Sequence, residues 1–167
     1  ADANSNKAGQ IGQADTGNGT PTANANAIDT KVTRLAAKSA DGIYVIESDS
    51  LTIDSTGAIS IEQVNFNSTT STVTDASLSD LETSDAGPIK VVTAAGTLTV
   101  NEGDPDDSGV KAGGSGNVLL EARGAASDVV LNADVNCKHI SIIAADDVDQ
   151  NADISSAGGT ILVSAAN

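Results

Sequence analysis

The chain has 167 residues, with 8 basic and 23 acidic side chains and a formal net charge of −15. It contains no Trp and no Met, and Tyr44 and Phe66 are its only aromatic residues. Such a chain has few large side chains with which to build an enzyme-like core, and it lacks the rings and basic grooves that nucleic-acid binding needs.

The acidity is of a particular kind, because Asp outnumbers Glu 18 to 5. Asp favours turns and strand ends, so the balance indicates a turn-rich extracellular β protein; the alternative is an acidic surface that only keeps the chain solvated. No stretch approaches the roughly 18 apolar residues of a membrane span, so we expect no membrane insertion. The chain opens without the basic and apolar segments of a signal peptide, which favours a mature product or an excised segment.

Residues 1–30 differ from the rest, since Ile11 and Ile28 are their only branched apolar residues. The composition predicts a polar low-complexity strap or linker. With so little to bury, this segment is expected to wrap its own molecule or to lie on a neighbouring copy.

The pattern of residues 31–167 predicts a second domain, built from repeats. Several segments share one template, in which an apolar–x–apolar run follows a turn, and a second such run ends in Asn or Asp. The copies begin near Gly42, Gly87, Gly116 and His139, and a half copy begins at Gly159. From Val118 to Ile140 is 22 residues and from Ile140 to Ile161 is 21, and self-similarity at a fixed period of this size indicates a solenoid.

The apolar residues alternate at i, i+2, which predicts strands; no window sustains the spacing of a helix. The fold class expected is all-β, a right-handed parallel β-solenoid (β-helix) of about 21–23 residues per coil. The 46 residues from Ile43 to Ile89 fit two coils, with strands at 59–61 and 64–66 inside them. The 29 residues from Ile89 to Val118 fit one coil that carries a polar loop insertion near residues 101–114.

Three asparagines, Asn101, Asn132 and Asn151, occupy one equivalent turn of the template, and Asp54 falls there too. Stacked Asn side chains can bond from coil to coil, so these residues form a candidate structural ladder. The alternative is three unrelated turn asparagines.

Asp104, Asp106 and Asp107 form the one local motif with metal-ligand chemistry, in a turn that Gly109 allows to be sharp. Calcium binds six to eight oxygens and is the candidate ion; the alternative is a solvated acidic loop. Asp146, Asp147 and Asp149 form a second acidic turn. We expect no other cofactor.

Catalytic chemistry is not expected. Cys137 and His139 are the only residues of their types and would face the same side of a strand, but no third group is placed to orient them. We therefore interpret Cys137 as a buried filler and the protein as a non-enzyme.

Two stretches resemble repeats of very large bacterial surface proteins, the filamentous-haemagglutinin-like adhesins and envelope repeat proteins. They are the run from Val32 through Ile53 and the run from Gly116 through Val148. The resemblance covers about residues 30–167. It implies a right-handed parallel β-helix and a role in adhesion, matrix or filament structure, and it carries over no catalytic residue.

The function expected is that of a non-enzymatic structural subunit that self-associates into an extracellular filament or sheath, by stacking of solenoids or by exchange of the N-terminal strap. The alternative is a stalk fragment of a large surface adhesin that binds a host, cell or carbohydrate surface. An ice-binding face is disfavoured, because Thr-x-Thr ranks do not recur in every coil.

Overall fold

The computed structural model describes residues 9–12 and 27–166, and within them the chain forms strands and turns without any α-helix. Three parallel sheets and one antiparallel hairpin account for the strands. Sheet A contains β1 (Gln10–Ile11), β2 (Ile28–Thr30), β5 (Gly42–Glu47), β10 (Ile89–Thr93), β13 (Asn117–Ala122), β16 (His139–Ala144) and β19 (Ile161–Ala165). Sheet B contains β3 (Arg34–Leu35), β6 (Leu51–Ile53), β11 (Leu98–Val100), β14 (Val129–Leu131) and β17 (Val148–Gln150). Sheet C contains β4 (Ala37–Ser39), β9 (Leu81–Thr83), β12 (Ser108–Ala112), β15 (Asp134–Cys137) and β18 (Ile154–Ser156).

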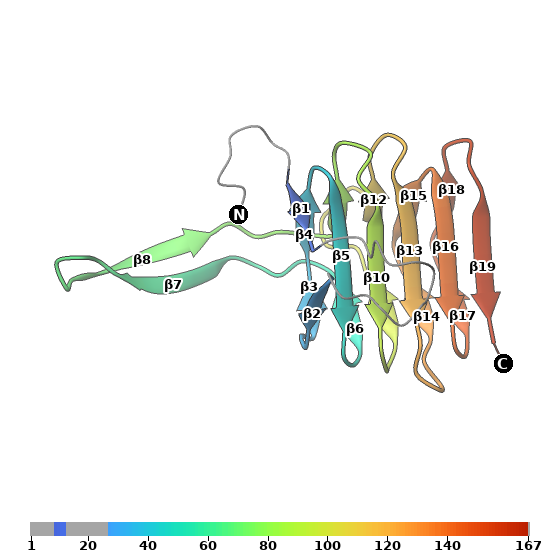
Figure 1. Cartoon of the computed structure of the whole chain (residues 1–167), viewed down its shortest axis with the longest axis horizontal. Helices are drawn as coiled ribbons and strands as arrows, with labels where there is room; N and C mark the ends of the chain where they lie inside the picture. Colours follow the sequence, from blue (N-terminus) through green and yellow to red (C-terminus); the bar gives the residue numbers. More distant parts are fainter. Residues whose placement is uncertain (1–8, 13–26, 167) are drawn as a thin grey trace.

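The chain passes through sheets A, B and C in that order and then begins the next coil. Successive coils pair in parallel, so Ile43 lies beside Ile89, Ile89 beside Val118, and Val118 beside Ile140. Figure 1 shows the coils side by side along one axis, with β1 to β4 at one end and β19 at the other. The fold is the parallel β-solenoid that the sequence predicts.

The described parts of residues 1–30 belong to the first rung of sheet A. Both β1 and β2 pair in parallel with β5, with Gln10 beside Gly42 and Ile28 beside Val45. The other residues of the predicted strap, 1–8 and 13–26, lie outside the described residues.

One coil assignment made from the sequence is wrong. Ile43 pairs directly with Ile89, so the 46 residues between them make one coil and not two. The surplus residues form a separate antiparallel hairpin of β7 (Ile59–Val64) and β8 (Thr70–Asp75), inserted where sheet B gives way to sheet C. The hairpin shares the i, i+2 alternation of the solenoid strands, so the pattern alone could not separate them.

The next coil carries its insertion at the same place, between β11 and β12. The irregular part spans residues 101–107, shorter than the 101–114 predicted, because Ser108–Ala112 forms β12 and pairs with sheet C strands on both sides. In the last two complete coils the same corner is crossed by residues 132–133 and 151–153 alone.

The core is the narrow interior between the three sheets, filled by aliphatic side chains stacked in files. One file runs through Ile43, Ile89, Val118 and Ile140, all buried. Full burial of such a side chain stabilises the fold by about 1.5–3 kcal/mol. The space between the three sheets is narrow, so the same small set of side chains recurs at each level. These are β-branched residues, Leu and Ala, and not large rings.

Candidate functional site

A polar ladder runs along the corner between sheets B and C. Asp54, Asn101, Asn132 and Asn151 directly follow β6, β11, β14 and β17, and the parallel register therefore brings them into one file. Asn151 Nδ2 donates to Asn132 Oδ1 at 2.9 Å, and Asn132 Nδ2 donates to Asn101 Oδ1 at 3.0 Å. These are the three asparagines that the sequence analysis put in the ladder.

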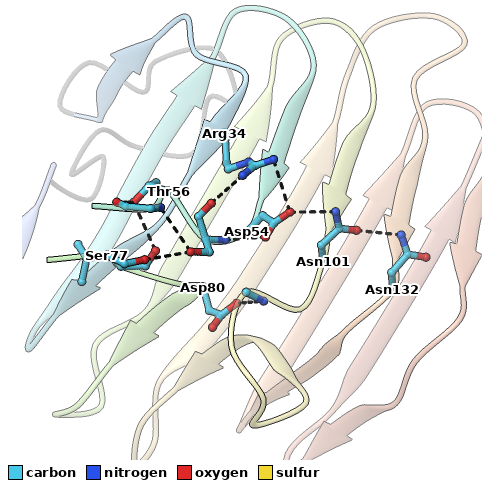
Figure 2. Close-up of polar contacts among 11 residues, drawn as sticks. Arg34, Asp54, Thr56, Ser77, Asp80, Asn101 and Asn132 are labelled. Carbon is cyan, nitrogen blue, oxygen red and sulfur yellow. Dashed lines mark hydrogen bonds and ion pairs between the residues drawn. The ribbon is translucent and has the colours of Figure 1, made fainter. Parts of the chain in front are cut away.

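The hydrogen bonds of the ladder all point the same way, and its N-terminal end is formed by a charged pair. Asn101 Nδ2 donates to Asp54 Oδ2 at 3.3 Å, and Arg34 Nη2 lies 4.0 Å from the same oxygen (Figure 2). Each amide donates toward the N-terminal end, so the file ends on the Asn151 Oδ1 acceptor, to which none of the described residues donates. The ladder locks the coils in register and leaves an acceptor at one end and a guanidinium near the other.

An acidic cluster lies on the same corner, one step toward sheet C. Carboxylate oxygens of Asp80, Glu102, Asp104 and Asp106 lie within 4.8 Å of one another. Asp80 is 5% exposed and accepts from Gly103 N at 2.9 Å.

The cluster is held by the turn itself. Ser79 Oγ donates to Asp104 Oδ2 at 2.5 Å, and Ser108 N donates to Asp106 Oδ1 at 3.0 Å. Two of the predicted ligands, Asp104 and Asp106, therefore meet, but the third, Asp107, is not in this group of oxygens. It stands at the turn of the loop with φ +63°, where its carbonyl accepts from Asp134 N.

Burial and like charge act together on this cluster. Burial raises the pKa of Asp80, and the neighbouring Asp104 and Asp106 carboxylates add to the rise. Burial and the nearby acids also raise the pKa of Glu102, whereas the Ser79 hydroxyl lowers that of Asp104. Carboxylate oxygens gathered in this way are ligands of the type that calcium prefers.

Sequence reasoning missed Asp80 and Glu102. Asp80 precedes β9 just as Asp134 precedes Val135 and Asp153 precedes Ile154, at places that the register makes equivalent. The signal was therefore an Asp at the same register position in three of the five sheet C strands, β9, β15 and β18, but the hairpin insertion separates Asp80 from its copies in the sequence. The second acidic turn, at residues 146–149, does not gather into such a group within the described residues.

The Cys137 thiol is buried, and its Sγ donates to the His139 carbonyl at 3.1 Å. Burial raises the pKa of Cys137 to about 11, which keeps the thiol protonated at neutral pH. His139 Nδ1 instead shares a hydrogen bond with the Thr160 hydroxyl at 3.0 Å. The Cys137 side chain therefore lies in the core, and the His139 side chain forms its hydrogen bond at the surface.

The largest apolar groups left in solvent lie at the C-terminal end and on the hairpin. Ile161, Leu162 and Val163 of β19 are exposed, Leu162 by 53%. On the hairpin Ile59 and Ile61 are each more than half exposed, and Phe66 at the tip is fully exposed. Exposed apolar groups that lie close together are typical of surfaces that contact another molecule.

These features define the class of the protein as a parallel β-solenoid with insertions at one corner. No family model matches the chain, and neither a curated protein nor a solved structure matches it. No helix among the described residues is long and apolar enough to span a membrane.

Proposed function

We propose that the protein is a non-enzymatic structural subunit that stacks end to end into an extracellular filament or sheath. The observation that carries this proposal is the form of the two solenoid ends. Among the described residues, no strand covers β17, β18 and β19 at one end or β1 to β4 at the other. Within the described residues, each end thus presents strand edges of the same parallel polarity, with which the strands of another copy would pair.

The backbone at the C-terminal end is oriented for one more rung. Ile140 N donates to Thr160 O, and Ala166 N donates to Ala144 O. Successive residues of a parallel strand bond alternately to its two neighbours, so the N–H groups of Ile161 and Val163 face away from β16. A second copy placed with its first coil here would continue the sheet A ladder.

The Asn ladder is also suited to continuation across this junction. It ends on the Asn151 Oδ1 acceptor, whereas the first coil carries the Arg34 guanidinium, which has more donors than its contacts with Asp54 and Ser55 use. Arg34 lies beside Thr52 in the register, two residues before the ladder position, so it offers donors near the ladder and not within it.

The proposed location and family are supported by features of the sequence and not by the fold alone. The excess of Asp and the resemblance to filamentous-haemagglutinin-like repeats support an extracellular or bacterial cell-surface role. The second candidate is a stalk segment of a large adhesin, in which the open rungs at β17 to β19 continue into further coils of the same chain.

A proline at the exposed edge tests the stacking. Val163→Pro removes an N–H that faces outward, so the β16–β19 ladder keeps its hydrogen bonds while the edge is blocked. Val163→Ala is the matched control, because it removes the same apolar side chain and keeps the N–H. We expect electron microscopy across a concentration series to show filaments of the wild type and of Val163→Ala but single particles of Val163→Pro. Single particles of the wild type at every concentration would refute the filament and leave the stalk.

A further inference from the structure

One face of the hairpin β7–β8 carries three of the four apolar side chains of its strands, together with Gln63, Ser71 and Asp75. Ile61 lies opposite Val73, and Ile59 lies two residues from Ile61, so strand alternation places these three side chains on one face. Ser60, paired with Thr74, lies on the other face, where their hydroxyls share a hydrogen bond of 2.7 Å.

Nothing in the described part of the chain covers the apolar face. Ile59, Ile61 and Val73 are 53%, 55% and 38% exposed, and every residue of both hairpin strands is exposed. A two-stranded hairpin in water is marginally stable by itself, and a surface packed against its apolar face would stabilise it.

The direction of the hairpin indicates what that surface is. Figure 1 shows β7 and β8 running along the solenoid axis and past the N-terminal end, beyond β1 and β4. Thr56 N donates to Leu78 O at 2.9 Å and closes the base of the insertion, and Arg34 Nη1 of β3 donates to Ser55 O at 2.9 Å and ties that base to the first coil (Figure 2). The hairpin therefore projects past the N-terminal end, where it would run alongside the last coils of a stacked copy.

The last two complete coils of such a copy present an open corner to the hairpin. The hairpin leaves its own solenoid at the B–C corner, and in the last coils this corner is crossed only by Asn132–Ala133 and by residues 151–153, without an insertion. Six-residue strands reach about 20 Å, or about four coil spacings. Charge does not favour the contact, because Asp75 lies opposite Ile59 on the docking face and Asp153 lies at the corner, so the apolar side chains must supply the attraction.

We infer that the hairpin is an intermolecular clamp: its Ile59–Ile61–Val73 face packs on the B–C corner of the last coils of the next copy. This inference rests on the proposed end-to-end stacking and names the second contact that holds it. The strand edges then set the register between copies, and the hairpin adds apolar contact along the side of the junction.

Two threonine variants test the clamp. Ile59→Thr/Ile61→Thr removes apolar groups from the docking face, whereas Val64→Thr removes one from the opposite face, and both keep β-branched residues that favour strands. Sedimentation across a concentration series should show that the double variant needs an at least about tenfold higher concentration to polymerise, while Val64→Thr stays within about twofold of the wild type. Equal behaviour of the two variants would overturn the clamp and leave stacking intact; a wild type that never polymerises would overturn both.

Cross-linking locates the contact directly. In a Cys137→Ala background, a chain with Ile61→Cys is mixed with a chain carrying Ala152→Cys, at the B–C corner, or Leu162→Cys, in sheet A of the same end. Mild oxidation should give a mixed covalent dimer with Ala152→Cys only. Dimers of Ile61→Cys with itself, or equal yields with the two partners, would refute the assigned surface.

Discussion

The hairpin and the solenoid coils share the same alternation of apolar residues, but these residues are exposed in the hairpin and buried in the inner coils. Ile61 in β7 and Ile142 in β16 both sit in six-residue strands with apolar residues two apart, yet Ile61 is 55% exposed and Ile142 is fully buried. A coil strand has a parallel neighbour on each side and a closed interior to fill, whereas each hairpin strand has one antiparallel partner. Alternation thus specifies a strand, and the partners of that strand decide whether it becomes core or contact surface.

Truncation of matched side chains is the strongest test of this contrast. Leu120 is fully buried in sheet A with strands on both sides, and Leu120→Ala should destabilise the protein by about 2–5 kcal/mol. Ile61→Ala in the hairpin should change the unfolding free energy of the monomer by less than about 0.5 kcal/mol. Urea unfolding followed by circular dichroism at a concentration below assembly measures both; a similar loss for the two variants would mean that the hairpin is part of the cooperative core.

A smaller effect is expected from the one fully buried carboxylate of the coils. Glu47 accepts from Val32 N and Ser48 N, at 2.9 and 2.8 Å, and from the Thr30 hydroxyl at 2.8 Å. Burial favours the neutral acid, but these donors outweigh it and lower the pKa of Glu47. The carboxylate therefore contributes stability above its unfolded pKa, and that stability is lost as the pH falls through the lower folded pKa.

Glu47→Gln should accordingly destabilise the protein by about 1.5–3 kcal/mol at neutral pH, with a smaller loss of stability on acidification than the wild type. Glu62→Gln, on the exposed hairpin strand β7, is the matched control and should leave both quantities unchanged. Thermal unfolding from pH 7 to pH 3 distinguishes the two. Parallel pH profiles for the wild type and Glu47→Gln would contradict the assigned hydrogen bonds.

The same contrast explains what could be predicted from the sequence. The repeat spacing of 21–22 residues and the Asn file were readable because the later coils repeat them without long insertions, and the register places Val118 beside Ile140 and Ile140 beside Ile161. The hairpin and Asp80 were not, because an insertion interrupts the period without changing the local pattern. Only the long-range pairing of Ala37 with Leu81 reveals where the solenoid resumes after the hairpin.

The smallest expected effect lies at Asp80, where the chain returns from the hairpin to β9. Burial and the nearby acids raise the pKa of Asp80, so the folded state holds its proton more tightly than the unfolded chain does. Its charge then costs stability at neutral pH, and stability recovers as the pH falls through the raised pKa. Asp80→Asn keeps an oxygen to accept from Gly103 N and removes the charge. It should stabilise the protein by less than about 1 kcal/mol at pH 7 and leave it unchanged once Asp80 is protonated.

Thermal unfolding with chelator and with millimolar calcium completes this test. Calcium, the ion predicted from the sequence for Asp104 and Asp106, would oppose the repulsion among the four carboxylates and raise the melting temperature of the wild type more than that of Asp80→Asn. Glu62→Gln is the control, because Glu62 lies on the exposed hairpin strand β7 and is not one of the four clustered acids. An equal response of wild type and Asp80→Asn to calcium would refute binding at this corner. The cluster would then be an acidic turn whose carboxylates are held close by the strand pairing of sheet C despite their repulsion.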